Sequence, residues 1–92
     1  MLTDAEIGQT VRDLRERMQL SQSAFAETIR SKGLGWHQPT VSRIEDGERP
    51  LRLAEALVLS ESFGFILPNG LGVSAGVKLS INTLEQLLKE IG

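Results

Sequence analysis

The fold of this chain is decided by the stretch Trp36-His-Gln-Pro-Thr-Val-Ser-Arg-Ile-Glu-Asp-Gly47. Val41 and Ile44 stand three residues apart, which places both on one face of a short helix. Pro39 favours a helix start, because proline lacks the amide hydrogen that a first turn leaves unpaired. Gly47 favours a stop, as a left-handed cap just past the end. We therefore predict a helix over 38–46, about two turns long and too short to be stable without neighbours.

The opposite face of this helix carries hydrogen-bonding side chains with one permanent cation and no carboxylate: Gln38, Thr40, Ser42 and Arg43. Side chains of this kind suit base edges and phosphates in the major groove of DNA. Arg43 suits guanine because its fork can donate to O6 and N7 together, and Gln38 suits adenine. We predict that these four residues read bases.

Two amphipathic helices are predicted before this stretch. The first is capped by Thr3 and buries one stripe of apolar residues: Ile7, Val11, Leu14 and Met18. The second is capped by Ser21 and buries three residues on its inner face: Phe25, Ala26 and Ile29. A connection over 31–37 follows, with two glycines. Trp36 is expected to fill the space that it opens, as a core anchor and not a base-stacking residue.

Three elements are predicted after Gly47. The segment from Leu51 to Phe63 is apolar on nearly every side, which predicts a helix buried at the centre of the core. Over 64–79 a turn signal and alternating apolar residues predict either an ordered loop or a short two-stranded ribbon. The last helix then presents one apolar stripe: Leu84, Leu87, Leu88 and Ile91. That stripe either meets its copy in a dimer or packs on Leu59 and Phe63 of the same chain.

Three segments of the chain resemble the phage-repressor helix-turn-helix family of the Cro/C1 or XRE type. They are Leu20-Ser-Gln22, Phe25-Ala-Glu27 and Gln38-Pro-Thr-Val-Ser-Arg-Ile-Glu-Asp-Gly47. The Gly-Leu-Gly-Trp-His-Gln run is similar to actinobacterial and actinophage regulators. The resemblance covers roughly residues 7–65 and implies an all-α, five-helix, lambda-repressor-like domain over 1–92. Its core would occupy 3–65, and 66–92 would serve dimerisation.

The expected phosphate contacts are four residues: Gln22, His37, Arg49 and Arg52. The resemblance places the first on the helix that crosses the DNA backbone, with a solvated first-turn residue as the alternative. His37 is expected to donate to a phosphate or to cap the base-reading helix over 38–46. The two arginines lie just after that helix in sequence.

One further pair is implied by the resemblance. Arg15 and Glu45 align with paired positions of the family, which predicts an ion pair between the first helix and the end of the third. The alternative is two independent surface charges, which would contribute little to stability.

Composition narrows the function classes. The 92 residues make one small domain, without cysteine and with one histidine, which removes disulfides, thiolate chemistry and a multi-histidine metal site. No phosphate loop, nucleophile elbow or metal spacing is present, so neither enzyme activity nor a cofactor is expected. No signal peptide opens the chain and no apolar run approaches the roughly 20 residues that cross a membrane. We expect a cytoplasmic protein of a prokaryote or phage.

The charge pattern fits a selective DNA-binding protein. A net charge of −2 argues against sequence-blind binding, because nonspecific affinity scales with phosphate-neutralising cations. Residues 28–53 nevertheless hold five cations against three anions, a local +2. We expect a sequence-specific transcriptional repressor that binds a palindromic operator in double-stranded DNA as a homodimer. The alternative is an antitoxin-type module of the same fold, which neutralises a partner protein and regulates its own gene.

Overall fold

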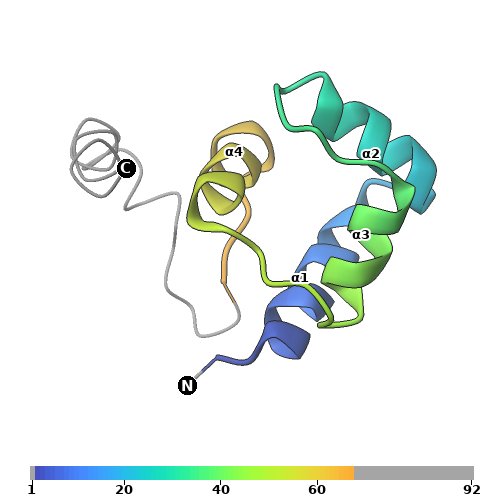
Figure 1. Cartoon of the computed structure of the whole chain (residues 1–92). Helices are drawn as coiled ribbons and strands as arrows, with labels where there is room; N and C mark the ends of the chain where they lie inside the picture. Colours follow the sequence, from blue (N-terminus) through green and yellow to red (C-terminus); the bar gives the residue numbers. More distant parts are fainter. Residues whose placement is uncertain (1, 68–92) are drawn as a thin grey trace.

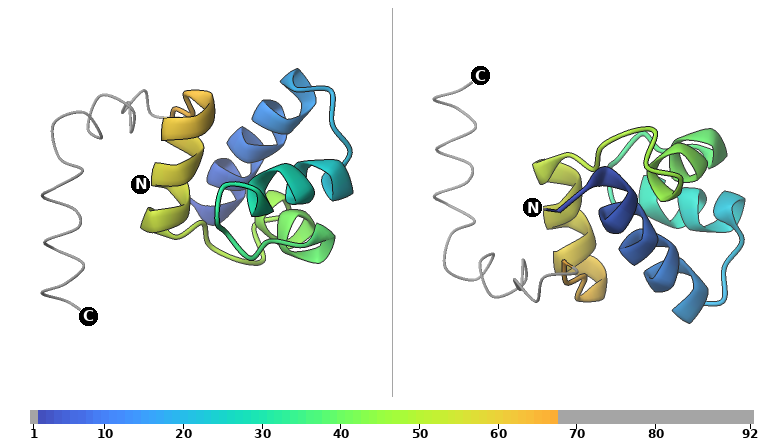
Figure 2. Two further views of the ribbon diagram at one scale, coloured as in Figure 1. Left: turned by 90° about the horizontal axis from the view of Figure 1, so that it is seen from above. Right: turned by 90° about the horizontal axis from the view of Figure 1, so that it is seen from below.

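The computed structural model describes residues 2–67, which form four helices joined by turns. They are α1 (Asp4–Arg17), α2 (Gln22–Arg30), α3 (Gln38–Glu45) and α4 (Leu53–Phe63). Helix α4 lies on one side of α1, and α2 and α3 lie on the other (Figure 1, Figure 2). The all-α class is confirmed for this part of the chain. The predicted fifth helix, the ribbon and the stripe from Leu84 to Ile91 lie outside the described residues.

Local signals in the sequence set the helix ends. The hydroxyl groups of Thr3 and Ser21 accept hydrogen bonds from backbone amides of the first turns of α1 and α2, both at 3.1 Å. Each bond satisfies a donor that has no partner within the helix. Gly47 follows α3 with a φ of 76°, as predicted, and a side chain there would also meet the backbone of Ala5. Glycine is therefore required at this position on two grounds.

One hydrophobic core joins the four helices. Its buried members are Val11, Leu14, Phe25, Ala26, Ile29, Trp36, Val41, Ile44, Leu59 and Phe65. Trp36 is only 2% exposed, and its ring centroid lies 6.4 Å from that of Phe25. The prediction that the tryptophan anchors the core is thus confirmed.

Helices α1 and α3 cross in close contact at Gly8. A Cβ atom built on this glycine would collide with the carbonyl oxygen of Ile44. The missing side chain therefore lets the two backbones approach, which positions α3 relative to α1.

Helix α4 differs from its prediction in two respects. It begins at Leu53 and not at Leu51, because Arg52 is extended and its amide donates to Glu55 Oε1 at 2.8 Å. It is also not buried on every side: Leu53 is 54% exposed, and Ala54 is exposed. The prediction of a helix at the centre of the core therefore applies only to its inner face, where Ala56 and Leu59 are buried. The apolar residues on its other face remain exposed, because folded proteins leave much apolar surface in contact with solvent.

Candidate nucleic-acid interface

The polar residues of α3 lie on its outer side. Val41 and Ile44 are buried where α3 packs against α1 and α2, whereas Gln38 and Arg43 are exposed. The side chain of Arg43 makes no ion pair or hydrogen bond with any other residue in the range 2–67. Thr40 and Ser42 are half-buried. The outer side of α3 thus offers an uncompensated cation and an amide, with two hydroxyl groups beside them.

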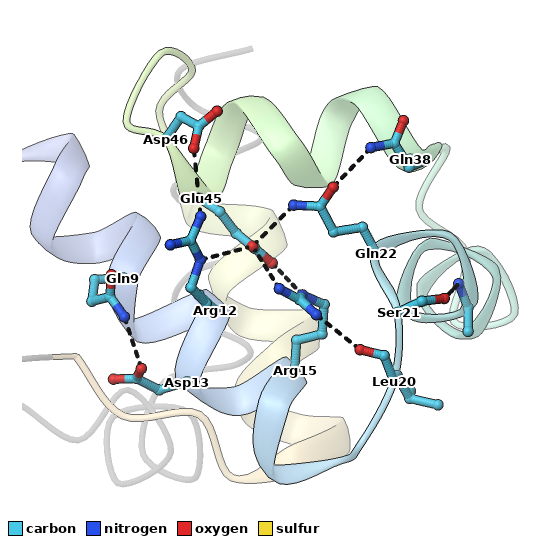
Figure 3. A network of polar contacts seen from close by, with 11 residues as sticks. Gln9, Arg12, Asp13, Arg15, Leu20, Ser21, Gln22, Gln38, Glu45 and Asp46 are labelled. Atoms are coloured by element: carbon cyan, nitrogen blue, oxygen red, sulfur yellow. Dashed lines mark hydrogen bonds and ion pairs between the residues drawn. The ribbon is translucent and has the colours of Figure 1, made fainter.

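A buried carboxylate anchors the end of α3 (Figure 3). The side chain of Glu45 is fully buried, and Arg15 binds it through Nε at 2.6 Å and Nη2 at 3.0 Å. Arg15 and Glu45 therefore lie together as an ion pair that joins α1 to α3. Arg12 adds a second cation, which the sequence analysis did not single out, with Nε 3.2 Å from Oε1 of the same carboxylate.

The surroundings of Glu45 keep it ionised. Burial alone would raise the pKa of this carboxyl group, because a charge is poorly solvated in the protein interior. Hydrogen bonds from Arg15, Gln22 and Arg12, together with the charge of Arg15, outweigh burial, so the pKa lies below its ordinary value. The carboxylate is consequently a permanent acceptor near neutral pH.

Gln22 connects this carboxylate to the outer side of α3. Its Nε2 donates to Glu45 Oε1 at 3.1 Å, and its Oε1 accepts from Gln38 Nε2 at 2.8 Å. Because an ionised carboxylate can only accept, it fixes which way the Gln22 amide points. Gln22 in turn orients Gln38, as Figure 3 shows. The chain Glu45–Gln22–Gln38 therefore sets the orientation of a predicted base-reading side chain before any DNA is present.

The segment before α3 is held by Arg30. Its Nη1 donates to the carbonyl oxygen of Trp36 at 2.7 Å and lies 3.3 Å from Nδ1 of His37. A guanidinium group can only donate, so this contact is a hydrogen bond in the tautomer that has Nδ1 as acceptor and carries its N–H on Nε2. His37 stands at the N-cap position of α3, and its backbone amide donates to the Thr40 hydroxyl at 3.3 Å.

A family comparison adds to this geometry. A family model described as "Helix-turn-helix domain" matches residues 6–65. The chain belongs to the helix-turn-helix family. No curated protein and no solved structure matches the chain significantly. Membership indicates a DNA-binding regulator. The matched range contains α2, α3 and α4 in full, α1 except for its first two residues, and every residue of the Glu45 network.

Two arginines of the helix-turn-helix domain, both expected at phosphates, lie in different environments. Arg49 binds Glu55 through Nη1 at 2.9 Å and Nη2 at 2.8 Å, and its side chain is 22% exposed. Arg52 is exposed, and its side chain has no ion-pair partner among the described residues. Glu55 was not among the residues predicted from the sequence, although a carboxylate within an otherwise apolar helix is itself a signal for a buried, paired charge.

The described part of the helix-turn-helix domain contains neither a metal-site geometry nor a membrane-spanning element. Within residues 2–67, no group of three or more His, Cys, Asp and Glu residues is placed to hold a metal ion. None of the four helices is long and apolar enough to cross a membrane.

Proposed function

We propose that the protein is a sequence-specific transcriptional regulator that reads duplex DNA with the outer side of α3. The observation that carries the proposal is the hydrogen-bonded chain from buried Glu45 through Gln22 to Gln38. Holding an amide in one orientation reduces the entropy lost when it binds a base. An amide presents an acceptor beside a donor, which complements N6 and N7 of adenine.

Arg43 is proposed as the second reading residue. It is exposed on α3 and has no ion-pair partner among the described residues, so its guanidinium can donate to O6 and N7 of a guanine. Thr40 and Ser42 would complete the reading set. Their hydroxyl groups can donate to or accept from a base edge.

Phosphate contacts are proposed on both sides of this surface. Arg52 is exposed beyond α3, and His37 has its Nε2–H available as a donor at the start of α3. Gln22 would donate the second hydrogen of its Nε2 to a phosphate, because the first hydrogen binds Glu45 and the Oε1 atom accepts from Gln38. For Arg49, a phosphate contact would have to be shared with Glu55.

We further propose that the protein acts as a homodimer on a palindromic operator and represses transcription, as its likeness to phage repressors suggests. A two-turn helix covers only a few base pairs, which limits both affinity and the information needed to find one site in a genome. The proposed interface is the stripe formed by Leu84, Leu87, Leu88 and Ile91.

The experiment that tests the proposal is selection of bound sites from random duplex DNA with the full chain. We expect an enriched inverted repeat with half-site centres about 10 base pairs, one helical turn, apart. Failure of the folded protein to enrich any sequence would contradict sequence-specific reading. Enrichment of a single half-site by a monomer would retain the reading surface and exclude the dimer.

A further inference from the structure

A second buried carboxylate, on α4, binds residues on both sides of α3. The side chain of Glu55 is 7% exposed, and both of its oxygens are fully engaged. Oε2 accepts from Trp36 Nε1 at 2.7 Å and from Arg49 Nη2 at 2.8 Å. Oε1 accepts from Arg49 Nη1 at 2.9 Å and from the amide of Arg52 at 2.8 Å.

The two side chains that Glu55 binds lie just outside the two ends of α3. Trp36 comes two residues before Gln38, the first residue of the helix. Arg49 belongs to the turn after α3, and its backbone amide donates to the carbonyl oxygen of Arg43 at 3.2 Å. One carboxylate is therefore connected to the segments on both sides of α3, through Trp36 before the helix and through Arg49 after it.

We propose that Glu55 is a positioning residue for DNA recognition, which acts through Trp36 and Arg49 and does not touch DNA itself. The inference rests on the proposed function of α3. Helix α3 packs on α1 and α2, and these contacts fix its inner side. Glu55 adds a restraint at each end, which sets the angle at which the outer side is presented.

The long connection before α3 gains this restraint in addition to the hydrogen bond from Arg30 to the Trp36 carbonyl oxygen. Residues 31–37 contain two glycines, and Gly33 adopts a φ of 99°, so the backbone there has few intrinsic restraints. The indole of Trp36 is the bulky group that closes this connection onto the core. Replacing the residues that orient metal ligands commonly lowers metal affinity or activity by about 10–100-fold, and we take this range as the guide for residues that orient a DNA-reading helix.

The test compares DNA binding, stability and fluorescence in the full chain carrying Glu55→Gln, which removes the charge and nearly preserves the shape. We expect affinity for the selected site to fall about tenfold, the lower end of that range, in protein that urea titration shows to be folded. The slope of affinity against salt should not become shallower, because the substitution removes no cation that could neutralise a phosphate. Trp36 is the single tryptophan of the chain, so a shift of its emission reports directly on the altered hydrogen bond.

The matched control is Glu61→Gln, which removes an exposed carboxylate from the same helix and should leave all three readouts at wild-type values. Folded Glu55→Gln protein that binds the site as tightly as wild type would overturn the proposal. If Glu55→Gln does not fold, Trp36→Phe decides, because it keeps a buried ring and removes only the indole donor. Wild-type affinity for Trp36→Phe would likewise overturn it. Failure of the wild-type protein to bind any duplex is a separate result, which contradicts the proposed function.

Discussion

Glu45 and Glu55 are both buried carboxylates that hold α3 in place, but their hydrogen-bond partners differ. Glu45 belongs to α3 itself and binds two guanidinium groups, from Arg15 and Arg12, together with the amide of Gln22. Glu55 belongs to α4 and binds one guanidinium group, an indole N–H and a backbone amide. The first is fully buried, whereas the second is 7% exposed.

The difference separates two tasks in one small domain. The Glu45 network joins α1, α2 and α3 and orients Gln38 directly through Gln22 (Figure 3). The Glu55 network joins α4 to the segments on either side of α3. One carboxylate therefore sets a side-chain orientation, and we propose that the other sets the position of the helix.

The largest expected effect is the loss of stability on removing Glu45. Glu45→Ala leaves Arg15 partly buried without its carboxylate, which costs about 3–5 kcal/mol when a buried pair is broken. Glu55→Ala should cost less stability, about 1.5–3 kcal/mol, because Glu55 binds a single guanidinium group, that of Arg49, which is more exposed than Arg15. Urea unfolding measures both. Glu27→Ala, an exposed control on α2, should stay within about 0.5 kcal/mol of wild type. Equal losses of stability for Glu45→Ala and Glu55→Ala would contradict the proposed difference between the two carboxylates.

Lowering the pH should destabilise the folded protein through both Glu45 and Glu55. Burial opposes ionisation of Glu55 as well, but hydrogen bonds from Arg49, Arg52 and Trp36 outweigh it, so the pKa of each carboxyl group lies below 4.5. The unfolded chain then binds more protons in this range, so stability rises with pH there. The contribution is complete above about pH 5 and is lost as pH falls through the lowered pKa.

Urea titrations across roughly pH 3 to 7 test this expectation. In Glu45→Gln and in Glu55→Gln, the free energy of unfolding should fall less steeply with decreasing pH than in wild type, because each variant lacks one titrating group. An unchanged pH dependence in both variants would show that other carboxyl groups control acid unfolding.

Replacing Arg49 should mainly lower the stability of the protein, whereas replacing Arg52 should mainly lower its affinity for DNA. Arg49→Ala removes a partner of Glu55 and should cost about 1.5–3 kcal/mol of stability. Arg52→Ala removes an exposed side chain, so stability should stay within about 0.5 kcal/mol of wild type. Its DNA affinity should fall for all sequences, and the salt dependence should become shallower by about one ion. A loss confined to one operator sequence would exclude a phosphate contact for Arg52.

The smallest expected effect concerns a buried hydroxyl group that has no hydrogen-bond partner within residues 2–67. Ser60 is 4% exposed, and its hydroxyl makes no hydrogen bond in the described part of the chain. Ser60→Ala should therefore stabilise the protein by about 1 kcal/mol, since an unsatisfied buried hydroxyl carries a desolvation cost. A higher urea midpoint is the expected observation, and a lower midpoint would indicate that the hydroxyl has a partner.

The sequence predicted the elements whose signals are local, and the structure supplied the long-range contacts. Hydroxyl caps, helical periodicity and Gly47 gave the first three helices, because each signal acts within a few residues. The approach of α1 to α3 at Gly8 and the hydrogen bond between Trp36 and Glu55 join residues far apart in the chain, so no spacing pattern reveals them. The Arg15–Glu45 pair was predicted only because a family resemblance supplied its long-range alignment.

The central claim, that the outer side of α3 reads bases, is tested most directly by Arg43→Lys. Lysine keeps the positive charge and loses the planar fork that binds O6 and N7 together. Affinities would be measured for the selected site and for every single-base variant of it. We expect Arg43→Lys to retain the wild-type salt dependence and to lose discrimination at one base pair in each half-site. A specificity profile identical to that of wild type would contradict the claim.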